Sequence, residues 1–272
     1  MLGSLNKALD AYRFNQAAGL LYEFIWHEFC DWYLELAKPI LVNREQKDTC
    51  LPAGRENRNT RIVLYKVLEK TLRCLHPFMP FITEEIWQKL YPSSAPSIMT
   101  QTWPHIQKQM IDKKAERRMR LAIEVITAIR NLRSQMNVAP AQKVNVSLIS
   151  IDKKTGKALE EVSGYIVNLA RLENLNLQAE RLKEKKGISA IVRDVRIHLE
   201  LEGLIDIDKE AERINKEISG LSASLKAKKS RLKNRDFLRK APADVVEKEK
   251  ESLSCGKGKL ADLTRIINEL KE

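Results

Sequence analysis

The sequence has little glycine and proline and only four cysteines. Its 272 residues include 10 glycines and 9 prolines, which argues against long disordered stretches. The cysteines, Cys30, Cys50, Cys74 and Cys255, are far apart and form no C-x-x-C pair. Neither a zinc site nor a disulfide framework is therefore expected. We interpret the four as reduced thiols of a cytoplasmic protein.

Long apolar runs are also missing. No stretch approaches the roughly 20 residues that a membrane-spanning helix needs, and the N-terminus lacks the pattern of a secretory signal. Charge is abundant and unbalanced, with 48 lysines and arginines against 36 acidic residues, a net charge of +12. That excess predicts an acidic partner, either a nucleic acid or an anionic membrane surface.

A corner with two prolines organises the first half of the chain. In His76–Trp87, "HPFMPFITEEIW", Pro77 and Pro80 cannot both lie inside one regular helix. One helix should end near Leu75 and another begin near Met79, with Pro80 in its first turn. The apolar residues keep helical spacing, which predicts a rigid corner between two core helices. They are Phe78, Phe81, Ile82, Ile86 and Trp87.

Helical periodicity extends over residues 1–140 and predicts a bundle. One helix of about 30 residues should run from the N-terminus to Pro39, another through Leu64–Leu75, and a last one from Asp112 to Met136. The candidate phosphate contacts are arginines, because a planar guanidinium donates two parallel hydrogen bonds. They are Arg13, Arg117, Arg130 and Arg133, together with Arg44, Arg55 and Arg58 of the polar connection between the first two helices. Solvated helix faces are the alternative.

Aromatic residues on the first helix have two possible roles. They could stack on unpaired RNA bases, or they could form the core, as an aromatic stripe at helical spacing more often does. These residues are Tyr12, Trp26, Trp32 and Tyr33.

Residues 141–205 predict a small α/β connector. A strand at Val144–Ile149, a helix at Leu159–Leu172 and strands near Leu175–Leu177 and Val195–Leu201 fit a β-α-β-β unit, with Gly187 at a turn. His198 falls on the polar side of an alternating strand, so we expect a surface histidine. No site chemistry is evident, and the region is interpreted as a spacer.

Residues 206–272 predict an antiparallel coiled-coil hairpin. Two runs with heptad spacing, Ile207–Leu232 and Val246–Leu270, flank a break at Asn234–Pro242. The charge at the tip is almost entirely basic, which favours a phosphate contact over a merely solvated coil. The candidate residues are Lys226, Lys229, Arg231, Lys233, Arg235, Arg239 and Lys240.

Four strings resemble a known family. "HPFMPFITEEIW", "TQTWP" and "IRNLRS" resemble the anticodon-binding helical domain of the valine, isoleucine and leucine group of class I aminoacyl-tRNA synthetases. "NRDFLRKAPADVVEKEKESL" resembles the arm tip of the valyl-tRNA synthetases. The isoleucine enzymes typically end in a cysteine-rich zinc module, which the scattered cysteines exclude.

The resemblance implies a function. The bundle would recognise the anticodon stem-loop of tRNA(Val), and the hairpin would lean on the outer corner of the L-shaped tRNA. The family's ATP-handling motifs, His-Ile-Gly-His and Lys-Met-Ser-Lys-Ser, do not occur in this sequence. ATP and Mg²⁺ would therefore belong to an absent catalytic part. We expect no cofactor, no metal, no valine activation and no editing in this C-terminal fragment.

The expected fold is mainly α. It comprises a helical-bundle anticodon-binding domain at 1–140, an α/β connector at 141–205 and a coiled-coil tRNA-binding arm at 206–272. We expect a monomer that binds neither membrane nor DNA. Two alternatives stay open, a coiled-coil assembly protein with incidental charge and an RNA-binding module with no anticodon preference.

Overall fold

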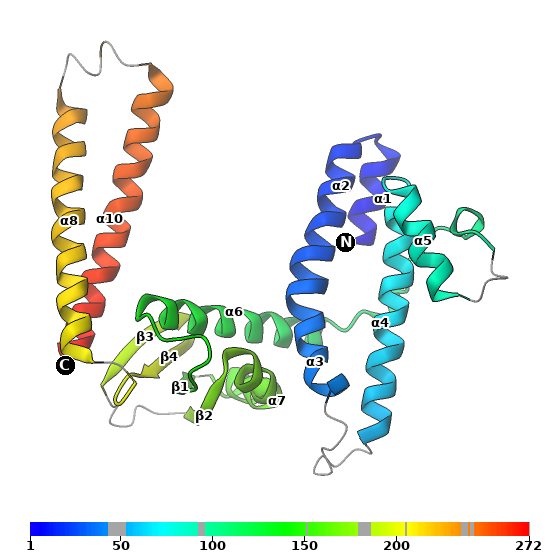
Figure 1. Ribbon diagram of the computed structural model, residues 1–272, viewed down its shortest axis with the longest axis horizontal. Coiled ribbons are helices and arrows are strands. Elements are labelled where there is room, and N and C mark those ends of the chain that lie inside the picture. The colour runs from blue at the N-terminus through cyan, green and yellow to red at the C-terminus, as the bar shows by residue number, and fades with distance from the viewer. Residues whose placement is uncertain are drawn as a thin grey trace. The chain divides into compact units, whose positions relative to one another are not determined.

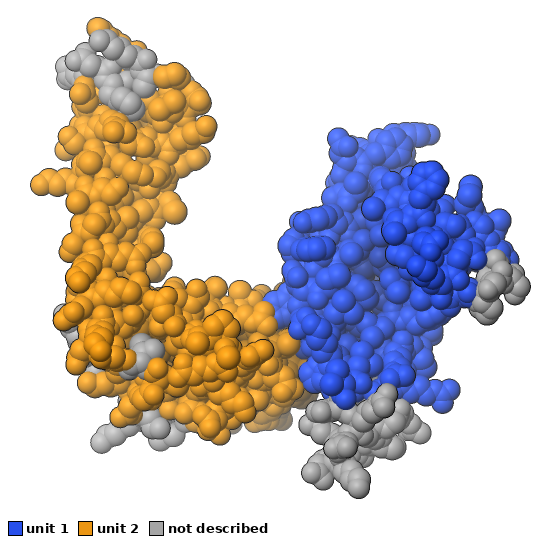
Figure 2. Space-filling view, in the orientation of Figure 1, with its two compact units in different colours: residues 1–112 blue, residues 113–272 orange. Residues whose placement is uncertain are grey.

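The computed structural model describes most of the chain, and that part forms two compact units (Figures 1 and 2). The described residues are 1–42, 53–91, 96–150, 152–178, 186–204, 206–234, 239 and 242–271. The units comprise residues Met1–Asp112 and Lys113–Glu272. The expected mainly α fold with a small α/β connector is confirmed.

The described part of the first unit consists of helices joined by turns and loops, with no strand. Its elements are α1 (Leu2–Asp10), α2 (Phe14–Tyr22), the π-helix η1 (Glu23–Leu34), α3 (Glu35–Val42), α4 (Ala53–Leu75), α5 (Pro80–Leu90) and the 3₁₀ turns η2 (Ile98–Thr100) and η3 (Lys108–Met110). One core cluster joins α1 and α2 to the end of α4, around Leu5, Leu21 and Cys74. The indole N–H of Trp103 donates to Asn6 Oδ1 at 3.0 Å and ties the later loop to α1.

The first long helix was predicted wrongly at both ends. The chain turns between α1 and α2, where Tyr12 has a φ of 56°. Pro39 does not end the helix but lies inside α3. A proline removes one amide donor, and a packed helix can continue past it with a local distortion. Arg55 and Arg58 belong to α4, not to a connection, because α4 begins at Ala53.

The proline corner is confirmed in its backbone but not in its packing. α4 ends at Leu75 and α5 begins at Pro80, and His76 Nδ1 lies 2.7 Å from Thr83 Oγ1 across the bend. Trp87 is buried and donates to the Pro96 carbonyl at 3.1 Å. Phe81 and Ile82 were expected in the core, yet Phe81 is 91% exposed and Ile82 half exposed. The stripe of apolar residues on α5 is therefore wider than the face that this helix buries.

The second unit contains a four-stranded sheet covered on one face by two helices (Figure 1). The strands run in the order β2-β1-β4-β3, with β1 and β2 parallel and the other neighbours antiparallel. α6 packs on β3 and β4, and α7 packs on β1 and β2. The elements are α6 (Lys113–Gln135), β1 (Val144–Ser150), α7 (Lys153–Ala170), β2 (Leu172–Gln178), β3 (Gly187–Val192) and β4 (Val195–Glu200).

Two expectations for the connector were wrong. Gly187 does not sit at a turn but begins β3, a strand that the periodicity did not reveal, and a Cβ there would lie 2.1 Å from the Leu199 carbonyl oxygen. His198 is buried at 4% exposure, not on the surface. β4 lies between β1 and β3, so His198 has Ser147 and Ser189 beside it in register. Its Nδ1 lies 3.1 Å from Ser189 Oγ.

The arm is a helical hairpin of α8 (Ile207–Lys233) and α10 (Ala243–Lys271), which pack along each other (Figure 1). Ile214 and Leu225 of α8 are buried in the seam. Lys228, which interrupts the apolar repeat, donates to Ser252 Oγ on the opposite helix. At Gly256 an added Cβ would lie 2.6 Å from Leu225 Cδ2, so the helices approach closely at that level.

The base of the arm is fixed to the connector. The amide of Ser189 in the edge strand β3 donates to Glu269 Oε2 of α10 at 2.6 Å. Arg213 of α8 donates to the Gln135 carbonyl at the end of α6, at 3.1 Å. α6 is thus part of the same compact unit as the sheet and the arm, although we expected it to close the first domain. The boundaries at residues 140 and 205 remain predictions.

Candidate nucleic-acid interface

The distal part of the arm, defined as residues 226–242, carries charge of one sign on α8. Every charged residue from Lys226 to Lys233 is basic, whereas acidic residues outnumber basic ones between positions 206 and 217 of the same helix. The charge therefore changes along α8, from slightly acidic at the base of the arm to strongly basic near its tip. The exposed basic residues are Lys226, Lys229, Arg231, Lys233 and Arg239.

The ion pairs of the arm also differ between its base and its distal part. Near the base, Arg213 binds Glu210 at 2.6 Å and Lys259 binds Glu217 at 2.8 Å. In the distal part only Arg231 has a carboxylate within range among the described residues, Glu249 at 3.4 Å. Uncompensated positive charge on an exposed helix attracts a polyanion and releases its counterions on contact. The other two predicted tip residues, Arg235 and Lys240, lie outside the described residues.

Arg133 of α6 is buried, in contrast to the arm residues. It is 6% exposed, and its guanidinium donates to five main-chain carbonyl oxygens. These belong to Ala170 at 2.7 Å, Arg171 at 3.3 Å, Ala139 at 2.8 Å, Pro140 at 3.3 Å and Gln142 at 2.6 Å. Burial, and then the charges of Arg171 and Arg130, lower the pKa of Arg133. Its donors are directed at the protein, so it anchors α6 to the end of α7 and to the loop before β1.

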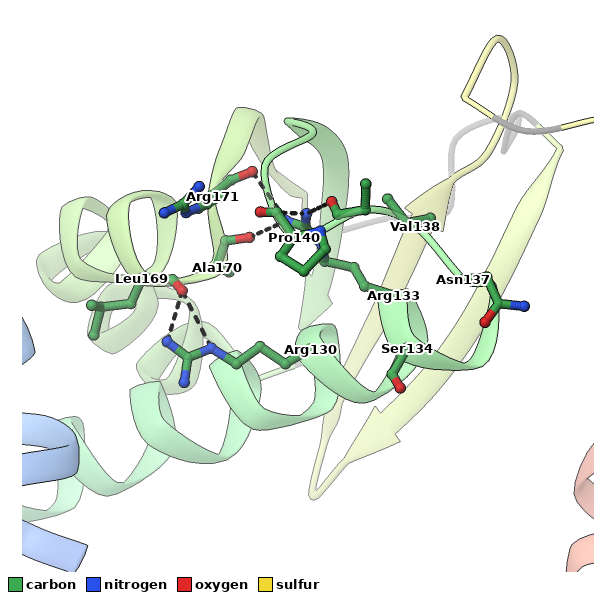
Figure 3. A pocket seen from close by; sticks show the side chains of 10 residues that line it. Arg130, Arg133, Ser134, Asn137, Val138, Pro140, Leu169, Ala170 and Arg171 are labelled. Carbon is green, nitrogen blue, oxygen red and sulfur yellow. Dashed lines mark hydrogen bonds between the residues drawn. The ribbon is translucent and has the colours of Figure 1, made fainter. Parts of the chain in front are cut away.

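A pocket of about 510 Å³ lies beside this anchor (Figure 3). Arg130 and Arg133 reach it from α6, and Arg171 follows the end of α7. The Arg130 Nη2 and Nε donate to the Leu169 carbonyl at 2.9 and 3.3 Å. The lining contains no acidic residue, so its charge is entirely positive. It consists of Arg130, Arg133, Ser134, Asn137, Val138, Ala139, Pro140, Leu169, Ala170 and Arg171.

The remaining predicted arginines are divided between the two units. Arg13 follows α1 and Arg58 lies in α4, both exposed in the first unit. Arg117 is exposed near the start of α6 and donates to the Lys113 carbonyl of its own helix at 3.1 Å. Arg44 lies outside the described residues, and the side chain of Arg55 does too.

The aromatic residues of the first unit differ in exposure. Tyr12 is 80% exposed and Trp26 about half exposed, while Trp32 and Tyr33 are partly buried. Tyr22, which our sequence reasoning missed, stacks on Trp26 with ring centroids 6.3 Å apart and planes 6° from parallel. Their spacing of four residues on one helix is the signal that could have found the pair.

No group of histidine, cysteine, aspartate or glutamate residues in the described part of the chain is arranged to hold a metal ion. Among the helices that the structure describes, none is long and apolar enough to cross a membrane. Cys30, Cys74 and Cys255 are free thiols, and Cys50 lies outside the described residues. The described chemistry is that of a basic surface.

Comparison with known proteins agrees with this surface. The family model "anticodon-binding domain of tRNA ligase" matches residues 2–148, and the model "valyl tRNA synthetase tRNA binding arm" matches residues 206–271. The chain therefore belongs to the family of tRNA ligases that carry this anticodon-binding domain. It joins that domain to a tRNA-binding arm of the valyl type, as the sequence resemblance predicted.

The curated relatives are valine–tRNA ligases. That of Syntrophotalea carbinolica is 40% identical over 97% of this chain and 29% of its own length. That of Carboxydothermus hydrogenoformans is 42% identical over 91% of this chain and 27% of its own. That of Thermotoga maritima is 35% identical over 98% and 29%. The chain spans less than a third of the length of these relatives.

Proposed function

We propose that this chain binds tRNA(Val) as the tRNA-binding part of a valine–tRNA ligase. In this proposal the helical bundle recognises the anticodon stem-loop, and the arm contacts the outer corner of the tRNA. Both contacts support the ATP-dependent attachment of valine by a catalytic part that these residues do not form. The observation that carries the proposal is the one-signed charge of α8 from Lys226 to Lys233, in a segment similar to a tRNA-binding arm.

The arm is suited to affinity more than to sequence discrimination. Its exposed groups are mostly lysines, which act as point charges toward phosphates and do not select a base. We assign the phosphate contacts of the arm to the predicted set, including the two residues outside the described ranges. The set is Lys226, Lys229, Arg231, Lys233, Arg235, Arg239 and Lys240.

The bundle is suited to base recognition. Tyr22 and Trp26 expose stacked rings, and aromatic faces bind unpaired bases. The proposed phosphate contacts that accompany them are exposed or undescribed arginines. In the first unit they are Arg13, Arg44, Arg55 and Arg58, and on α6 of the second unit they are Arg117 and Arg130. We leave Arg133 out of this set, because its donors are taken up by main-chain carbonyls.

An assembly role for the coiled coil is less well supported. The buried seam residues Ile214 and Leu225 of α8 pack within the chain's own hairpin, so that seam needs no second molecule. We therefore infer that the chain is a monomer. We also propose that it acts on tRNA(Val) in the cytoplasm. ATP and Mg²⁺ would be used by the catalytic part and not by this chain.

The test is binding of the full chain to three transcripts at two salt concentrations. These are tRNA(Val), tRNA(Val) with an altered anticodon, and an unrelated tRNA. The proposal predicts the tightest binding to intact tRNA(Val) and a steep loss of affinity with salt. Equal affinity for all three transcripts would contradict the proposed anticodon recognition. No binding at low salt would contradict the proposal as a whole.

A further inference from the structure

The pocket beside Arg133 includes a segment to which neither family model assigns a role. The matched regions end at residue 148 and resume at residue 206. Leu169, Ala170 and Arg171 lie between them, and they form one wall of the pocket while α6 and the loop after it form the other. The connector, which the sequence indicated to be a spacer, thus contributes a positive charge to a concave surface.

The backbone of this pocket is unusual at two positions. Asn137 and Arg171 have φ values of 49° and 53°, and they are two of the four non-glycine residues with positive φ in the described part of the chain. A left-handed residue after a helix is common, but it is usually glycine and sometimes asparagine. Asn137 fits that pattern. Arg171 does not, because in this conformation its Cβ comes close to the following carbonyl oxygen.

The left-handed conformation of Arg171 forms the cap of α7, in which its N–H is directed at the carbonyls of Val167 and Asn168. Arg171 is exposed and follows α7, and its own carbonyl is held by Arg133 Nη1. Arg133 therefore fixes the backbone from which the Arg171 side chain extends. Burial, and then the nearby positive charges of Arg171 and Arg130, lower the pKa of Arg133. A bound anion would relieve that repulsion.

We propose that this pocket binds a backbone phosphate of RNA. Arg171 and Arg130 are the contact residues, and Arg133 is a positioning residue that holds the pocket open between α6 and α7. The pocket is larger than one phosphate group, which suits a nucleotide unit of a polymer (Figure 3). The inference rests on the proposed tRNA binding and extends it to the connector.

The chain offers a matched pair of variants for the test. Arg171→Gly removes the guanidinium and also relieves the left-handed backbone. Arg193→Gly makes the same change at φ 54° in the β3–β4 turn, where the side chain pairs with Glu124 at 2.6 Å, outside the pocket. Both variants lose one positive charge, and glycine suits both backbones. The affinity of the full chain for a tRNA(Val) transcript is measured from 50 to 200 mM salt. The melting temperature of the wild type and of each variant is measured as well.

The expected result is specific to the pocket. Arg171→Gly should weaken RNA binding by about threefold to tenfold and lower the slope of log affinity against log salt by about one. Arg193→Gly should leave the RNA affinity and the salt slope near their wild-type values. Arg171→Lys, which keeps the charge, should recover most of the slope. The melting temperature of Arg171→Gly should not fall.

Other outcomes would overturn the inference. Wild-type affinity and slope in Arg171→Gly would show that no phosphate binds there, while tRNA binding by the wild type would leave the proposed function intact. An equal loss in Arg193→Gly would show a general charge effect. Absence of tRNA binding by the wild type would contradict both proposals.

Discussion

The guanidinium of Arg133 donates a 2.7 Å hydrogen bond to the carbonyl oxygen of Ala170. This carbonyl belongs to the last residue of α7, where main-chain acceptors have no partner within the helix. A cation at a helix C-terminus also interacts favourably with the helix dipole. Arg133 thus fills a structural role that helix ends require, at the point where α6 meets the connector.

Replacing Arg133 by alanine should therefore destabilise the second unit. Five carbonyl oxygens, of which that of Ala170 accepts a buried hydrogen bond, would lose this donor at once, and we expect a loss of about 2–4 kcal/mol in the free energy of unfolding. Arg120→Ala, at an exposed position of the same helix, should change stability by less than about 0.5 kcal/mol. Urea denaturation of the full chain measures both, and equal stability of the two variants would contradict the anchoring role.

Two glycines of α10 should respond differently to alanine. At Gly258 an added Cβ meets no atom within 4 Å, so Gly258→Ala should stabilise the arm by about 0.5–1 kcal/mol through helix propensity. At Gly256 the Cβ would lie 2.6 Å from Leu225 Cδ2. Part of the same gain is then lost because Leu225 must move. Thermal unfolding followed by circular dichroism should show the larger gain at position 258, and the reverse order would contradict the close approach of the helices.

Alkylation should separate two of the cysteines. Burial raises the pKa of the Cys74 thiol to about 11. At pH 8 only about one thiol in a thousand would be ionised at that site, and the thiolate is the reactive form. Cys255 is exposed. Peptide mapping after iodoacetamide treatment of the folded chain should therefore show fast labelling of Cys255 and very slow labelling of Cys74. Comparable rates would indicate that the core around α1 and α4 is open.

Much of this architecture follows from periodicity and from local rules. Pro80 placed the start of α5 correctly, because a proline in the first helical turn loses no hydrogen bond. The heptad spacing predicted the hairpin, and the uneven charge predicted its basic distal part. Each of these features depends on residues close together in the chain.

The misses depend on contacts between distant segments. The burial of His198 results from the position of β4 between two other strands, and alternation along β4 alone contains no such information. The turn at Tyr12 lacks the glycine or proline that usually indicates a break. Arg133 looked like its neighbour Arg130, and both donate to carbonyls at the end of α7, but only Arg133 is buried. Sequence could therefore predict the basic character of the site but not which arginine is structural.

In the proposed function the arm supplies affinity, while the bundle supplies discrimination. The most direct measurement is the affinity of the full chain for tRNA(Val) and for its anticodon-altered form, in the wild type and in the double variant Lys226→Glu, Lys229→Glu. Lys216→Glu, on the proximal part of α8, shows the effect of one such charge reversal outside the distal part of the arm.

The double variant should weaken binding to both transcripts by the same factor and leave their affinity ratio unchanged. Lys216→Glu should have a much smaller effect. A change of that ratio in the double variant would show that the distal arm takes part in anticodon discrimination, and would contradict the division of roles between bundle and arm.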